Sequence, residues 1–129
     1  PFYVRGDKGR LKQVISNLLS NAIRYTNIGG RIRVTVQSEG EYVCICVSDD
    51  GAGISAEHTP YIFERFYRAD DSRERADGGT GIGLTISKAI VEAHDGQIEV
   101  MRPGLFGVGT TFTIQMPQTK LDSRSTILR

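Results

Sequence analysis

The sequence predicts one α/β domain of the α+β type, a two-layer sandwich with about three helices on one face of a mixed, mainly antiparallel sheet of about five strands. Apolar residues recur at helical spacing in two segments, and strand-like alternation occurs in two pairs of neighbouring segments. The βαβ rhythm of a doubly wound sheet is missing. A chain of 129 residues suits a single core.

The first helix is expected to begin after Asp7, whose side chain suits an N-cap, and to run to about Tyr25. Its apolar residues recur at positions i, i+3, i+4 and i+7, which predicts one buried stripe. They are Leu11, Val14, Ile15, Leu18, Leu19, Ala22 and Ile23. The segment 26–30 then ends the helix, because it is rich in turn-forming residues.

A hairpin of two half-buried strands is expected next. Ile32, Val34 and Val36 alternate with polar residues, and a turn at 39–41 leads into the second strand. There one face is expected to carry Val43, Ile45 and Val47 and the other Tyr42, Cys44, Cys46 and Ser48. The two cysteines are expected to be reduced structural thiols, since residues two apart on one strand do not form an easy disulfide.

The second half of the chain repeats the order helix and then hairpin. A short helix is expected over 62–68, followed by a charged, mobile loop over 68–77. Glycines at 78, 79, 81 and 83 open a second amphipathic helix that Gly96 ends. Its inward residues are expected to be Ile82, Ile86, Ala89, Ile90 and Ala93. Strands are expected over 97–101 and 110–117, so the domain covers 1–117 and leaves a polar tail over 118–129.

Composition and charge exclude several classes of protein. With 16 basic and 15 acidic residues the chain gives no global reason to expect nucleic acid as a partner. No apolar run approaches the roughly 20 residues that cross a bilayer, so we expect no direct membrane contact. The cysteines and histidines do not form a zinc or nucleophile motif.

Asn17, Asn21 and Arg24 lie on the polar stripe of the first helix. One interpretation is a solvated face. The other is a ligand site, in which the neutral carbonyl oxygen of Asn21 binds Mg²⁺, a cation that prefers oxygen donors.

Two glycine-containing segments are also candidate parts of a ligand-binding site. Asp50-Gly51-Ala52-Gly53-Ile54 is either an ordinary turn or a site whose carboxylate accepts a hydrogen bond from an exocyclic amine such as that of adenine. The segment 79–84, Gly-Thr-Gly-Ile-Gly-Leu, offers unhindered N–H groups at a helix start, which suit phosphate oxygens. Each motif is weak when it stands alone.

In this order and spacing the segments resemble the N, G1, F, G2 and G3 boxes of the histidine-kinase ATPase domain. The boxes correspond to the asparagine helix, residues 50–53, 63–68, 79–84 and 107–112, and the resemblance covers about 4–117. It implies a Bergerat-type fold that binds ATP between the first helix and a flexible lid.

The resemblance also implies residue roles. Asn21 would be the metal ligand and a catalytic residue, and Arg65 or Arg68 would reach the γ-phosphate. Thr110 and Thr111 would either line the adenine pocket or be plain strand residues. Asp50 would recognise the adenine amine. The remaining nucleotide-binding positions are Asn17, Arg24, Tyr25, Gly51, Gly53, Ile54, Gly79, Thr80, Gly81, Ile82, Gly83 and Leu84.

The implied function is that of the ATP-binding catalytic domain of a two-component sensor histidine kinase. Such a domain binds Mg-ATP and donates the γ-phosphate to a histidine on a dimerisation domain in the same or a separate chain, with a response regulator downstream. We expect a cytoplasmic domain of a membrane-anchored kinase. His58 and His94 are expected to be surface or capping residues, not the acceptor. Two alternatives stay open: a non-catalytic ATP-binding interaction module, or a serine-directed kinase of the anti-sigma type.

Overall fold

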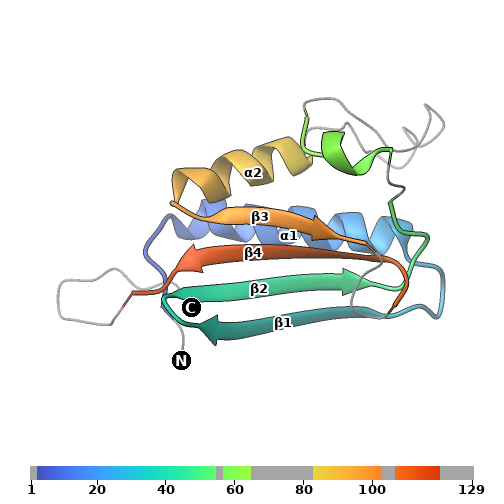
Figure 1. The fold of residues 1–129 in the computed structure, drawn as a ribbon, viewed down its shortest axis with the longest axis horizontal. Helices are drawn as coiled ribbons and strands as arrows, with labels where there is room; N and C mark the ends of the chain where they lie inside the picture. Colours follow the sequence, from blue (N-terminus) through green and yellow to red (C-terminus); the bar gives the residue numbers. More distant parts are fainter. Residues whose placement is uncertain (1–2, 55–56, 65–82, 103–106, 120–129) are drawn as a thin grey trace.

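The fold is a two-layer sandwich of helices on a sheet (Figure 1). The computed structural model describes residues 3–54, 57–64, 83–102 and 107–119. In chain order its elements are α1 (Lys8–Tyr25), β1 (Ile32–Glu39), β2 (Tyr42–Asp49), the 3₁₀ turn η1 (Thr59–Tyr61), α2 (Gly83–Ala93), β3 (Gln97–Met101) and β4 (Thr110–Pro117).

The four strands lie in the order β1-β2-β4-β3, and each neighbouring pair is antiparallel. Val4 adds an isolated antiparallel bridge to Gln118, so the described part of the chain contains no parallel pair. Gln118 and Thr119 also donate backbone hydrogen bonds to the carbonyls of Glu41 and Tyr3. These contacts attach the first two residues of the expected tail to the sheet.

Helix α1 begins and ends as expected. The carboxylate of Asp7 accepts a hydrogen bond from the backbone N–H of Arg10 at 3.0 Å, which caps the helix. Val14, Leu18 and Ala22 are buried against the sheet. Ile23 was predicted to lie on the buried stripe but is 65% exposed. The apolar stripe of α1 is wider than the part of the helix that the other described residues cover.

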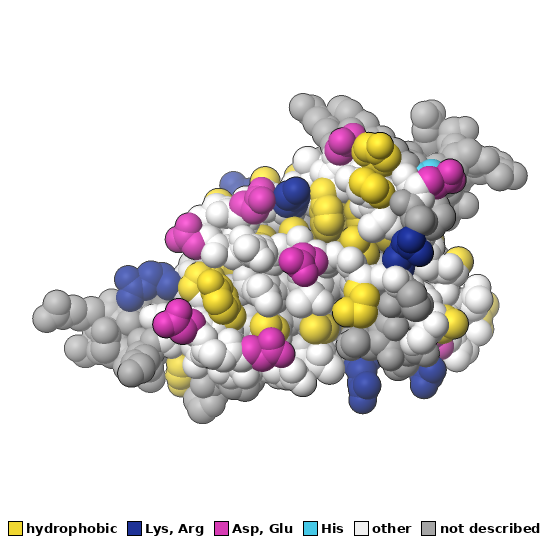
Figure 2. Space-filling view, in the orientation of Figure 1, with side chains coloured by type: hydrophobic (Ala, Val, Ile, Leu, Met, Phe, Trp, Pro, Cys, Tyr) yellow, Lys and Arg dark blue, Asp and Glu magenta, His cyan; other side chains and the backbone are white. Residues whose placement is uncertain are grey.

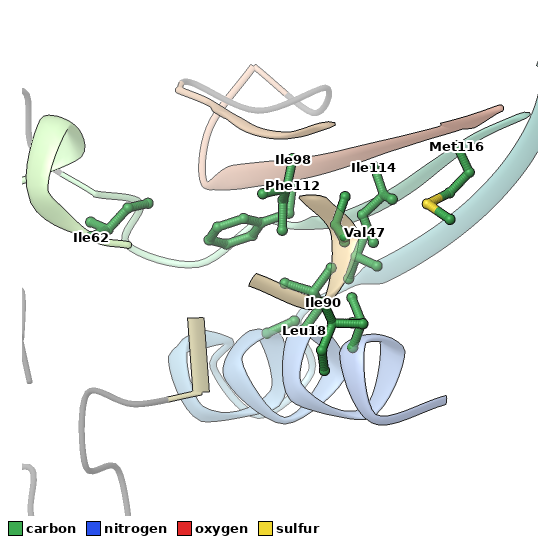
Figure 3. Close-up of a cluster of buried hydrophobic side chains, with 11 residues drawn as sticks. Leu18, Val47, Ile62, Ile90, Ile98, Phe112, Ile114 and Met116 are labelled. Atoms are coloured by element: carbon green, nitrogen blue, oxygen red, sulfur yellow. The ribbon is translucent and has the colours of Figure 1, made fainter. Parts of the chain in front are cut away.

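The core lies between the helices and one face of the sheet. Leu18 and Ile90 approach it from the helices, and Val47, Phe112 and Ile114 from the strands (Figure 3). The ring of Phe63 meets that of Phe112 edge to face, with centroids 6.2 Å apart. This contact joins residues 62–64 to the core.

Helix α2 buries Ile90 as expected, and Ile86 packs against the core, but the rest of its buried set differs from the expected one. Ser87, Ile90 and Val91 are buried, whereas Ala89 and Ala93 are exposed. The buried stripe is shifted by one position from the expected one, because α2 packs on α1 as well as on β3. Ser87 is the residue that faces α1. Asp95, not Gly96, takes the left-handed backbone conformation after the helix, with φ of 61°.

Two further expectations need correction. Residues 62–64 form a turn that follows η1, not the start of a helix, and 65–68 lie outside the described residues. On β1, Ile32, Val34 and Val36 are between 36% and 47% exposed, since β1 is the edge strand and no described helix covers it. Within the described ranges, no helix is long and apolar enough to span a bilayer.

Candidate functional site

Two consecutive carboxylates at the end of β2 have opposite environments. Asp49 is 4% exposed and continues the row of Val43, Ile45 and Val47 on the helix-covered face. Its Oδ1 accepts a hydrogen bond from the backbone N–H of Gly51 at 2.9 Å. Burial raises the pKa of Asp49, since a low-dielectric surrounding disfavours the charged form.

Asp50, the residue chosen from the sequence, is bound by Arg31 instead. Its Oδ1 accepts from the backbone N–H of Arg31 at 2.9 Å, and its Oδ2 lies 3.3 Å from Nε of the same residue. The Arg31 backbone hydrogen bond, with the side chain adding to it, lowers the pKa of Asp50. The sequence did contain a signal for Asp49, because the alternation of β2 places it, and not Asp50, on the core face.

Glycines bring three backbone segments into contact beside Asp49. A Cβ on Gly51 would overlap the carbonyl of Tyr25 at the end of α1, and a Cβ on Gly109 would overlap the carbonyl of Asp49. Gly53 has φ of 78° and faces the carbonyl of Gly109. The end of α1, the loop after β2 and the start of β4 therefore meet at this corner.

The polar stripe of α1 meets α2 at Asn17, so this part of the stripe is not a solvated face. The Asn17 amide nitrogen donates to the carbonyl oxygen of Gly83 at 3.2 Å and lies 3.3 Å from Oγ of Ser87. Asn21 lies one turn further along the same stripe. It is partly buried, and its side chain makes no hydrogen bond to another residue of the described ranges.

The other residues near α1 separate into two groups. Arg24 stacks over the ring of Tyr25, 5.9 Å from its centroid, at the end of the helix. Thr110 is the register partner of Asp49. Thr111 is buried on the opposite face of the sheet, where its hydroxyl pairs with that of Ser48 at 2.9 Å. Of the two threonines, Thr110 is therefore the one on the side of Asp49.

The segment after η1 is held on α2. The hydroxyl of Thr85 donates to the carbonyl of Phe63 at 2.8 Å, and the Lys88 ammonium lies 5.6 Å from the centroid of the Phe63 ring. Ile54 and Leu84 pack against the core. Gly79, Thr80, Gly81, Ile82, Arg65 and Arg68 lie outside the described residues, as does the expected lid.

On the face that Figure 2 shows, surface charge does not single out another site. Figure 2 shows acidic and basic side chains interspersed on the visible face, with no continuous patch of one sign. Among the described residues no group of three or more His, Cys, Asp or Glu could hold a metal ion. The buried carboxylate, the glycine corner and the asparagine stripe are therefore the features that need a functional explanation.

Comparison with known families shows the class of protein to which this chain belongs. Residues 6–120 match the family described as histidine kinase-, DNA gyrase B-, and HSP90-like ATPases. The chain belongs to this family. Its members bind ATP, and the domain is of the sensor histidine kinase type, as predicted from the order of the motifs.

Similar proteins agree with this assignment. Sensor histidine kinase RppB of Synechocystis is 43% identical over 89% of the chain, and sensor protein SrrB of Staphylococcus aureus is 42% identical over 87%. The chain spans only 25% and 19% of the length of these relatives.

Solved structures confirm the fold. The mycobacterial sensor histidine kinase MprB has a TM-score of 0.79 and 31% identity, over 94% of this chain and 78% of that one. The nucleotide-free catalytic domain of histidine kinase ThkA has a TM-score of 0.75 and 32% identity, over 89% and 70%. The predicted Bergerat-type sandwich is thus confirmed.

Proposed function

We propose that this domain binds Mg-ATP and donates the γ-phosphate to a histidine on a separate dimerisation domain, as the catalytic half of a sensor histidine kinase. The observation that carries the proposal is the buried Asp49 carboxylate at a corner where glycines let three backbone segments meet. A buried charge is costly unless it is paired or hydrogen-bonded. Within the domain the Asp49 carboxylate accepts the N–H of Gly51, and a bound ligand would supply a further donor.

The adenine end of the site is proposed to lie at Asp49 and not at Asp50. Asp49 already accepts the N–H of Gly51, and a carboxylate has further lone pairs that can accept from an exocyclic amine. Asp50 is used by Arg31. Thr110, the strand partner of Asp49, is the proposed second polar residue there.

The phosphate end is proposed to lie between α1 and the first turn of α2. Asn21 offers a neutral oxygen one helical turn from the Asn17 contact to α2, which fits Mg²⁺ because that ion keeps waters and substrate phosphates as its other ligands. When bound, the metal would neutralise charge on the phosphates. Arg24, at the end of the same stripe, supplies positive charge.

The protein's own part in this reaction is mainly positioning, since phosphoryl transfer has a loose transition state that needs alignment and charge neutralisation. Asp49 orients the base, and the N–H groups at the start of α2 favour the anionic phosphates. Arg65 or Arg68 is proposed to reach the γ-phosphate, and residues 68–79 are proposed to cover it. No described residue takes the role of phosphate acceptor in this scheme.

The wider setting is also a proposal. A histidine-bearing dimerisation domain in the same or another chain would receive the phosphate, and a response regulator would accept it next. The domain would work in the cytoplasm as part of a membrane-anchored sensor. We place the end of the domain after Thr119 and not after Pro117, because Gln118 and Thr119 bond to the sheet.

The test is a transfer assay with radiolabelled ATP. The chain is incubated with Mg²⁺ and γ-labelled ATP, alone and with the purified dimerisation domain of a homologous kinase. We expect acid-labile label on the dimerisation domain and none on the chain alone. Binding of ATP without transfer would support a non-catalytic ATP-binding module, and acid-stable label on a serine would support an anti-sigma-type kinase.

A further inference from the structure

We propose that Ser87 is a positioning residue for the phosphate end of the nucleotide site, and that it acts through Asn17. The inference rests on the proposed function and adds a residue that no sequence motif identified. Its basis is a part-buried polar contact between α1 and α2.

Ser87 is a fully buried hydroxyl in a helix that is otherwise apolar on that side. It has no exposed surface, and its neighbours on the buried stripe of α2 are Ile90 and Val91. A buried hydroxyl without a partner is costly. The Asn17 amide nitrogen, 3.3 Å away on α1, is such a partner.

Asn17 uses both amide hydrogens on α2. One reaches the carbonyl of Gly83 at 3.2 Å and the other Ser87, which lies one helical turn further on. An asparagine amide has two N–H donors, so none is left for a phosphate. Asn17, which was expected near the phosphates, therefore holds the first turn of α2 instead of donating to the nucleotide.

The consequence is a defined distance between the proposed metal ligand and the start of α2. Asn17 and Asn21 are four residues apart on one rigid helix, and Gly83 is the first residue of the other. A two-point attachment at Gly83 and Ser87 resists rotation of α2 as well as sliding. Hydrogen bonds of this length tolerate shifts of only a few tenths of an ångström.

The experiment measures affinity for Mg-ATP and for adenosine with the chain and its Ser87→Ala variant. Loss of the hydroxyl frees one Asn17 hydrogen and loosens the first turn of α2, so we expect ATP affinity to fall about threefold to tenfold. Adenosine carries no phosphate and should bind as before. Thr113→Val is the matched control, since it removes a part-buried hydroxyl on the opposite face of the sheet.

Coupling to Asn17 is tested by a double-mutant cycle. In an Asn17→Ala background, Ser87→Ala should have no further effect on the ratio of ATP to adenosine affinity, because its partner is gone. The inference would be overturned if Ser87→Ala lowered the affinity for ATP and for adenosine equally, or left the affinity for ATP unchanged. It would also be overturned if Ser87→Ala had its full effect on the affinity ratio in the Asn17→Ala background. If the unmodified chain binds neither ligand, the proposed function itself fails, and this inference with it.

Discussion

The backbone of Asp49 occupies the space that a side chain at Gly109 would need. Gly109 has φ of 73°, so it is in a conformation that favours glycine as well as in a confined position. The start of β4 can therefore lie against the loop that carries the buried carboxylate. The shape of the proposed adenine end thus depends on the absence of a Cβ at Gly109.

Gly109→Ala is expected to destabilise the domain more than Gly107→Ala. Both glycines have positive φ, but a Cβ at Gly107 meets nothing within 4 Å. Strain alone costs Gly107→Ala about 1–2 kcal/mol, whereas overlap at Gly109 adds about 1–3 kcal/mol. Urea unfolding of the two variants is the measurement. Equal losses would show that the corner is not tightly packed.

Asn21→Ala is expected to leave the fold intact and to abolish the gain in ATP affinity that Mg²⁺ gives. Asn21 lies outside the buried set of α1, so its side chain is not needed for packing. Titration of ATP with and without Mg²⁺ measures the gain, and thermal unfolding checks the fold. A metal-dependent gain as large as that of the unmodified chain would remove Asn21 from the metal site.

The two aspartates are expected to give opposite pH dependence. Burial raises the pKa of Asp49 in the folded state. The favourable contribution of this carboxyl to the free energy of unfolding is therefore largest below about pH 3.9, and it is lost as the pH rises through the pKa of the folded state. Asp50 has a lowered pKa, so it stabilises above about pH 3.9, and this is lost as the pH falls through its folded pKa.

Unfolding free energies measured between about pH 3 and pH 7 test this. Relative to the unmodified chain, Asp49→Asn should gain stability as the pH rises, and Asp50→Asn should lose it. Changes of the same sign in both variants would contradict the assigned environments.

His94 ties the end of α2 to the start of α1. Its Nε2 accepts the backbone N–H of Asp7 at 3.0 Å, and its Nδ1 lies 2.7 Å from the carbonyl of Ile90. His94→Ala should therefore cost about 0.5–1.5 kcal/mol of stability and leave ATP affinity unchanged. His58→Ala, which removes a contact to the exposed Glu57 carboxylate, is the control and should cost less. Weaker ATP binding by His94→Ala would link this contact to the site.

Much of the fold could be predicted because its signals are local. The cap at Asp7, the alternation on β2 and the bounds of β3 and β4 each depend on neighbouring residues. The errors come from tertiary context. Ile32, Val34 and Val36 alternate like a half-buried strand, but β1 lies at the sheet edge, where burial depends on what covers it.

The site was harder to predict than the fold. Asn17 and Ser87 are far apart in sequence, and nothing local shows that the polar stripe of α1 faces another helix. Strand alternation alone puts Asp49, and not Asp50, on the core face, so the residue that we propose for the adenine end could be predicted from the sequence. Strand alternation also separates Thr110 from Thr111, because neighbouring residues of β4 point to opposite faces of the sheet.

The most direct test of the account is the ATP affinity of Asp49→Asn beside that of Asp50→Asn, measured by calorimetry on the folded proteins. Asparagine at 49 keeps an acceptor for Gly51 but removes the anionic acceptor proposed for the adenine amine. We expect ATP affinity to fall about tenfold to a hundredfold in Asp49→Asn, the range of a hydrogen bond to a charged group, and by less than about threefold in Asp50→Asn. A large loss in Asp50→Asn with near-normal binding by Asp49→Asn would contradict the account.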